Sequence, residues 1–96
     1  MVYIASEWDE EKARLNILKH GVSFEEAQSV LNDRLVIILA GEREANAEER
    51  WFAIEMNKAN KLLAVWYTER GESVRIIGAR KATKAERRIY ENEQLS

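Results

Sequence analysis

The sequence contains no cysteine and no proline, and only one histidine among its 96 residues. Without cysteine, neither a disulfide framework nor a thiolate zinc site is possible, so the fold must depend on packing. One histidine and carboxylates without ligand spacing do not make a metal site, and we expect no metal and no cofactor. The four glycines form no Gly-x-Gly-x-x-Gly or Walker-type loop. These absences exclude the classes of enzyme that bind dinucleotides or nucleoside triphosphates through such loops.

Long apolar runs are also absent. Apolar residues make up 46% of the chain, but no run approaches the roughly 20 residues that a membrane-spanning helix needs. The first residues lack the charged leader and apolar core of a signal peptide. No repeat or Gly/Ser-rich linker marks a boundary. We therefore expect one domain over residues 1–96, in the cytoplasm and without a membrane partner.

The charge of the chain is unevenly distributed. The net charge is only −2, yet residues 70–88 hold 7 of the 15 Lys and Arg residues and only 2 acidic residues. A local excess of positive charge on an otherwise acidic chain is typical of a phosphate-binding surface. A solvated helix face would give the same pattern, and charge alone does not separate the two interpretations.

The first third of the chain predicts one strand and two helices. The strand is expected over Val2–Glu7. The first helix should begin after the N-cap Asp9 and end at His20, because Gly21 is suited to the left-handed C-terminal position. Ser23 has the capping-box spacing to a Glu three residues later, which predicts a second helix ending near residue 32.

The rest of the chain predicts four strands followed by a helix. Short turns separate the last three strands, so consecutive strands should pair antiparallel. The polar segment 41–49 is expected to be a loop, and Thr83 with Glu86 repeats the capping-box spacing for a last helix. The predicted strands are Leu35–Ala40, Arg50–Met56, Leu62–Thr68 and Val74–Ala79. The predicted fold is α+β, in the order β-α-α-β-β-β-β-α, with helices packed on one face of an antiparallel sheet.

Arginine and lysine are the candidate functional residues of the basic segment. Arg80 is expected between a strand end and a helix N-terminus, where backbone amides and the helix dipole favour an anion. The alternative is that Arg80 forms an ion pair with Glu72 or Glu86. The other basic residues of the segment are Arg70, Arg75, Lys81, Lys84, Arg87 and Arg88.

Two aromatic residues precede this segment. Trp66 and Tyr67 are consecutive in a predicted strand, so they must point to opposite faces and one of them should leave the core. An exposed aromatic ring beside arginines suits single-stranded RNA, which is bound by stacking and by charge. The alternative is a core position, which we also expect for Trp8 and Trp51.

Several segments of the sequence resemble the BrnT toxins. They are Trp8-Asp9 with Lys12, residues 19–27 beginning Lys-His-Gly-Val-Ser-Phe, residues 49–51, residues 67–70, residues 75–77 and the Ala-Arg-Lys-Ala string at 79–82. The resemblance covers nearly the whole chain. It implies a RelE-like fold, a metal-independent endoribonuclease activity, and a BrnA-like antitoxin that binds operator DNA through a ribbon-helix-helix domain. The chain departs from the family pattern at Gly78, where the family tends to have serine.

RNA carries its own nucleophile, the 2′-hydroxyl, so positioning and charge stabilisation are the main tasks of such an enzyme. Arg80 is predicted to hold the scissile phosphate, Arg75 and Arg70 to contact phosphate or sugar, and Tyr67 to orient or stack a base. The sequence does not identify the general base. The candidates are His20, Tyr67, Tyr90 and Glu86, and for His20 we favour a structural role at a helix end.

Two alternatives stay open at this point. The chain could be a non-catalytic binding module that pairs with a DNA-binding antitoxin or repressor. It could also be an interaction domain whose arginines pair with its own acidic side chains.

The outer basic residues are predicted to attract the RNA backbone without sequence preference. They are Lys81, Lys84, Arg87 and Arg88.

Overall fold

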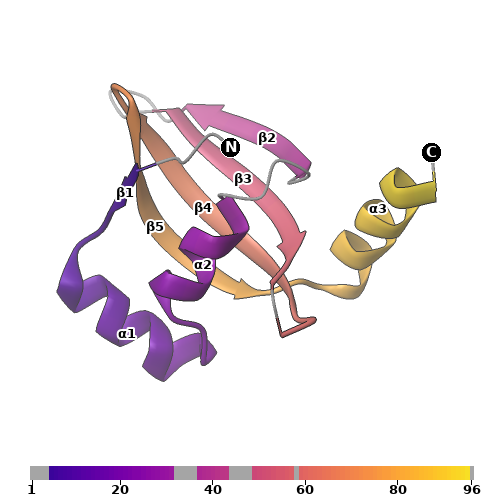
Figure 1. The fold of residues 1–96 in the computed structure, drawn as a ribbon, viewed down its shortest axis with the longest axis horizontal. Coiled ribbons are helices and arrows are strands. Elements are labelled where there is room, and N and C mark those ends of the chain that lie inside the picture. The colour runs from indigo at the N-terminus through magenta and orange to yellow at the C-terminus, as the bar shows by residue number, and fades with distance from the viewer. Residues whose placement is uncertain (1–4, 32–36, 44–48, 58, 96) are drawn as a thin grey trace.

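The computed structural model describes residues 5–31, 37–43, 49–57 and 59–95 (Figure 1). Its elements follow the predicted order of one strand, two helices, four strands and a final helix. They are β1 (Ala5–Glu7), α1 (Glu10–His20), α2 (Phe24–Leu31), β2 (Ile37–Arg43), β3 (Glu49–Met56), β4 (Leu62–Arg70), β5 (Ser73–Lys81) and α3 (Lys84–Leu95). Parts of the first two predicted strands, residues 2–4 and 35–36, lie outside the described residues. Residues 44–48 of the predicted loop 41–49 also lie outside the described residues. The first three residues of that loop, 41–43, belong to β2.

The strands form one sheet in the order β1-β5-β4-β3-β2. The prediction of antiparallel pairing in consecutive order is confirmed for β2 to β5. β1 departs from it, because its three residues pair with Ser73–Arg75 of β5 in parallel. The hairpin argument applies only to strands joined by short turns, whereas two helices follow β1 and bring it to the open edge of β5.

The two N-terminal helices begin and end where their capping residues predicted. Asp9 Oδ1 accepts a hydrogen bond from the Lys12 amide at 3.0 Å, and Gly21 ends α1 with φ of +69°. In α2, the Glu26 amide donates to Ser23 Oγ at 3.1 Å and the Ser23 amide donates to Glu26 Oε1 at 3.2 Å. These reciprocal bonds are the predicted capping box.

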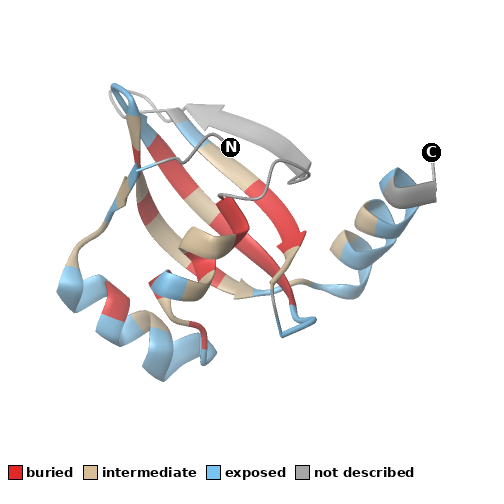
Figure 2. Cartoon of the chain, in the orientation of Figure 1, coloured by how far each residue is buried: buried red, intermediate tan, exposed pale blue. Residues whose placement is uncertain are grey.

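The core lies between these helices and one face of the sheet (Figure 2). Phe24 and Val30 of α2 are fully buried and belong to the same cluster as Leu63, Val65 and Ile76 of the sheet. Trp8 and Trp51, which we predicted as core residues, pack against this cluster while partly buried. The helices from Asp9 and Ser23 therefore cover one face of the sheet, as predicted.

The last helix, α3, extends away from the end of the sheet (Figure 1). Its Tyr90 hydroxyl donates a hydrogen bond of 2.7 Å to Oε1 of Glu55 in β3. Glu55 is only 3% exposed, and its Oε2 has no hydrogen-bond partner. A carboxyl group this deeply buried needs its partners, so the Tyr90 hydroxyl is one of the anchors of α3.

We expect the Tyr90→Phe variant to lower the free energy of unfolding by about 1–3 kcal/mol, because it leaves the buried Glu55 carboxyl group less satisfied. Urea denaturation followed by circular dichroism measures this change. The matched control is Arg88→Ala, which alters an exposed side chain of the same helix. Equal midpoints for the parent and Tyr90→Phe would show that the bond does not hold α3.

Candidate active site

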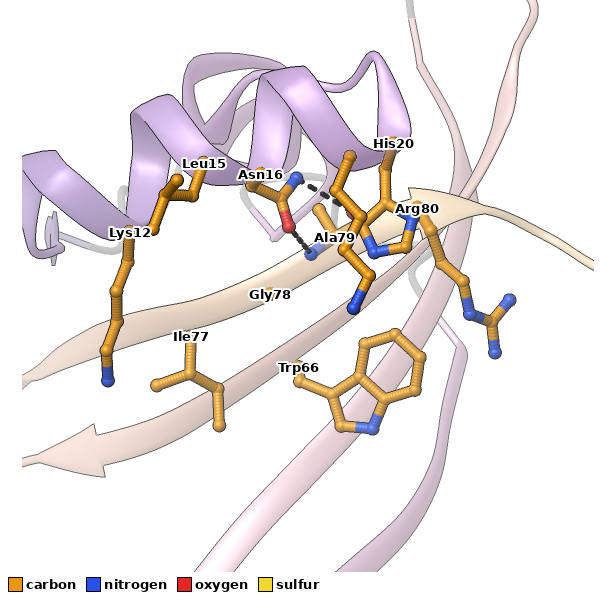
Figure 3. Close-up of a pocket in the computed structure, with 10 residues that line it drawn as sticks. Lys12, Leu15, Asn16, His20, Trp66, Ile77, Gly78, Ala79 and Arg80 are labelled. Carbon is orange, nitrogen blue, oxygen red and sulfur yellow. Dashed lines mark hydrogen bonds between the residues drawn. The ribbon is translucent and has the colours of Figure 1, made fainter.

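The edge of β5 is shared between β1 and helix α1. β1 pairs only with Ser73–Arg75 of β5. Further along this edge, the side chain of Asn16 in α1 makes the backbone hydrogen bonds that a neighbouring strand would make. Its Nδ2 donates to the Ala79 carbonyl at 2.9 Å, and its Oδ1 accepts from the Ala79 amide at 3.3 Å (Figure 3). The same Nδ2 donates to the Val22 carbonyl at 2.9 Å. Asn16 thus satisfies a sheet edge and fixes α1 beside it.

A pocket of about 370 Å³ opens between α1 and β5 (Figure 3). Its lining combines four side chains that carry or can carry positive charge with one large aromatic ring, and it includes no carboxylate. The lining residues are Lys12, Leu15, Asn16, Lys19, His20, Trp66, Ile77, Gly78, Ala79 and Arg80. This composition suits a polyanion that also offers a planar ring.

A β-bulge in β5 turns Arg80 toward this pocket. Trp66 pairs with Gly78 whereas Tyr67 pairs with Ile76, so Ile77 is an extra residue in the ladder. Ile76 and Ala79 both face the core, although strict alternation would place only one of them there. If Ile77 were a regular residue of the ladder, strict alternation would place Arg80 on the core face with Ile76. Bulges commonly redirect side chains beside functional sites in this way.

Arg80 is held on three sides. Its Nη1 and Nη2 donate to the two carboxylate oxygens of Glu86 at 2.8 and 2.9 Å, and Nη1 also donates to the Lys81 carbonyl at 3.1 Å. Its Cζ lies 4.7 Å from the centre of the Trp66 ring, which is a cation–π contact. The hydrogen bonds from Arg80 lower the pKa of Glu86. The expected alternative, an Arg80–Glu86 ion pair, is therefore present.

This ion pair leaves one edge of the Arg80 guanidinium available. A guanidinium has five N–H donors, and Glu86 and Lys81 occupy three of them. In the part of the chain that the structure describes, Nε–H and the second N–H of Nη2 have no partner. These two donors are parallel, which is the arrangement that binds two oxygens of one phosphate. Arg80 can therefore bind Glu86 and a phosphate together.

Trp66, and not Tyr67, is the aromatic residue at the pocket. Tyr67 is 6% exposed and belongs to the core cluster, and burial raises the pKa of its hydroxyl. Trp66 is half-buried between Phe52, at 4.7 Å between ring centres, and Arg80. One of the two residues does leave the core, as alternation predicted, but the structure does not bring Tyr67 to the site.

Of the predicted basic residues, only Arg80 lines the pocket. Arg75 lies near the other end of β5, where its Nη1 is 3.6 Å from a carboxylate oxygen of Glu7. Arg70 is exposed at the end of β4. The remaining ones are exposed at the end of β5 or on α3, namely Lys81, Lys84, Arg87 and Arg88.

Sequence reasoning missed Lys12, Lys19 and Asn16 as site residues. They lie on α1, far from residues 70–88 in the sequence, and the net charge of their surroundings is not basic. The available signal was the family resemblance, which includes Lys12 and the string that begins at Lys19. In the described ranges, no group of three or more His, Asp or Glu side chains is arranged to hold a metal ion.

The position of His20 is compatible with a structural role at a helix end and with a role at the pocket. It is the last residue of α1, next to the C-terminal Gly21, where a positive charge is compatible with the helix dipole. It is also exposed, and its ring extends from the helix end to the part of the pocket that holds Arg80 (Figure 3). Among the residues described, no hydrogen bond or ion pair occupies the imidazole.

Gly78 leaves space at the pocket. A Cβ atom at this position would lie 4.0 Å from Trp66 Cε3, which is an ordinary contact distance. The glycine therefore widens the pocket without being needed for the backbone, and the serine of the family pattern would also fit.

Comparisons with known proteins agree with this architecture. A family model described as the ribonuclease toxin BrnT of type II toxin-antitoxin systems matches residues 8–86. The 1.1 Å crystal structure of the Brucella abortus ribonuclease toxin BrnT is similar over 84% of this chain and 99% of that chain, with 25% sequence identity and a TM-score of 0.64. No curated protein matches the sequence. No helix among the described residues has the length and apolar character needed to cross a membrane. The chain belongs to the BrnT family of ribonuclease toxins of type II toxin-antitoxin systems.

Proposed function

We propose that this toxin is a metal-independent endoribonuclease that cleaves RNA in the cytoplasm by attack of the 2′-hydroxyl on the adjacent phosphate. The 2′-oxygen forms a bond to phosphorus, the bond to the 5′-oxygen breaks, and the products carry a 2′,3′-cyclic phosphate and a 5′-hydroxyl. One proton leaves the nucleophile and one reaches the departing oxygen. The observation that carries the proposal is the pocket that unites Arg80, Trp66, His20 and two lysines.

Arg80 is the proposed ligand of the scissile phosphate. Its Nε edge is unoccupied among the described residues, while Glu86 and Trp66 fix the plane of the guanidinium. A donor that is already oriented stabilises the charge of the pentavalent phosphorus without reorganisation during the reaction. Lys12 and Lys19 add positive charge on the opposite wall. In place of Tyr67, we assign the contact with a base to Trp66.

His20 is the proposed general base. Each other candidate has a contact or position that disfavours this role. Tyr67 is buried in the core, the Tyr90 hydroxyl donates to Glu55, and Glu86 is engaged by Arg80, which lowers its pKa. His20 is exposed at the pocket, and histidine is the residue whose charge ordinarily changes near neutral pH.

The basic residues outside the pocket are proposed to attract the RNA backbone. Lys81, Lys84, Arg87 and Arg88 continue the positive charge from the end of β5 along α3, and Arg70 and Arg75 lie toward the other end of the sheet. Contacts of this kind raise the affinity for RNA of any sequence, and they weaken as the salt concentration increases.

We expect the purified toxin to shorten a single-stranded RNA in the presence of EDTA, because none of the proposed steps uses a metal. Products are resolved on denaturing gels and their ends identified by mass spectrometry. The control substrate carries one 2′-deoxynucleotide at the mapped cleavage position, which removes the nucleophile and should block the cut there. Binding of RNA without shortened products would instead support the non-catalytic binding module.

Membership of the family also implies an antitoxin partner. We propose that this partner is a BrnA-like ribbon-helix-helix protein, and that the toxin reaches operator DNA only through it. The pocket lining brings together four side chains that carry or can carry positive charge and includes no carboxylate. An acidic segment of the antitoxin that covers the pocket would block RNA by occupying the same charges.

A further inference from the structure

Helix α1 exposes three large apolar side chains. Leu15 and Ile17 are each 49% exposed and Leu18 is 72% exposed. In the described part of the chain, Ile89 of α3 is the one other large apolar residue that is exposed. Exposed aliphatic side chains gathered on one short helix mark a contact surface more often than scattered ones do.

This apolar surface continues into the pocket. Leu15 belongs to both, since it lines the pocket wall between Lys12 and Lys19. Leu15 and Leu18 are three residues apart and thus neighbours on the helix surface. A ligand that spans both regions meets two leucines on one side and the cations of Lys12, Lys19 and Arg80 on the other.

We infer that Leu15 and Leu18 are the docking site of the toxin-binding segment of the antitoxin, an amphipathic segment with apolar side chains against the leucines and carboxylates directed to the pocket. The inference deepens the proposed function, on which its inhibitory consequence rests. Charge complementarity supports this occupant, because no carboxylate lines the pocket. RNA satisfies the cations but offers no aliphatic surface for Leu18.

The apolar contact also gives the antitoxin an advantage over its competitor. RNA and an acidic peptide compete for the same cations, and both attractions weaken with salt. Burial of leucine side chains is nearly independent of salt and available only to the protein partner. The two leucines therefore provide selectivity for antitoxin over RNA.

The Leu18→Asn variant tests the inference, because Leu18 is the most exposed of the three residues and does not line the pocket. Its affinity for the purified full-length BrnA-like antitoxin, measured by titration calorimetry, should fall about 10- to 100-fold. Its rate of RNA cleavage should equal that of the parent. The matched control is Ile89→Asn on α3, which should bind the antitoxin with the parent affinity.

Parent affinity in Leu18→Asn, or an equal loss in Ile89→Asn, would overturn the inference. Sedimentation of the toxin alone gives a further check. A parent dimer that Leu18→Asn dissociates would assign the surface to a second copy and also overturn it. Because binding is measured without RNA, a parent that fails to cleave RNA would refute the proposed function while the docking result still stands.

Discussion

The Arg80→Ala variant is expected to cut RNA roughly 10²- to 10³-fold more slowly than the parent, by analogy with the loss of one oxyanion donor. In the proposed mechanism, the two N–H groups of Arg80 that have no partner among the described residues bind the phosphate, whose charge increases in the transition state. Its loss should therefore affect the chemical step more than RNA affinity. Single-turnover rates at saturating RNA measure this step directly.

Arg87→Ala is the matched comparison, since it removes a positive charge that is exposed on α3 and outside the pocket. It should weaken binding to all RNA sequences and lower the slope of log affinity against log salt by about one. Its rate at saturating RNA should remain near that of the parent. Opposite effects of the two variants would separate chemistry from backbone attraction.

A second control addresses the structural role of Arg80, which joins β5 to the first turn of α3 through Glu86. If Arg80 serves only to anchor that helix, Glu86→Gln should slow cleavage as much as Arg80→Ala does. If Arg80 acts on the phosphate, Glu86→Gln retains the guanidinium and should be much faster. Thermal melts establish that each variant is folded. A folded Arg80→Ala protein that cuts at the parent rate would remove Arg80 from the mechanism.

The helix ends could be predicted from sequence because capping is local. Asp9, Gly21 and the Ser23–Glu26 pair act on backbone groups no more than four residues away, so the short spacing contains the whole interaction. The antiparallel order of β3 to β5 followed from short turns for the same reason. The parallel pairing of β1 has no local signal, because its partner is some seventy residues away along the chain.

The site was harder to predict because it depends on contacts between distant segments. A count of charge along the chain found Arg80 but not Lys12 or Lys19. These two lysines reach the same pocket because α1 packs against β5, where Asn16 bonds to Ala79. Alternation required either Trp66 or Tyr67 to leave the core without deciding which. The bulge at Ile77 decides the side on which Arg80 lies, and one extra residue in a ladder leaves no clear pattern in a single sequence.

The His20→Ala variant is expected to lower the single-turnover rate by about 10²- to 10⁴-fold, the usual contribution of a general base. A base must be unprotonated to accept the 2′-hydroxyl proton, so the parent rate should fall as the pH is lowered. The variant should lose this dependence, and added free imidazole should restore part of the rate at high pH.

Lys19→Ala is the appropriate comparison for His20→Ala, because Lys19 precedes His20 at the end of the same helix and lines the same pocket. It should weaken RNA binding and lower the salt slope while keeping the pH dependence of the parent, since a lysine there supplies charge and no base. This separates loss of charge at the helix end from loss of proton transfer. If His20→Ala instead keeps the slope of log rate against pH that the parent shows, His20 is not the base, and its position beside Gly21 has only the structural role at the helix end.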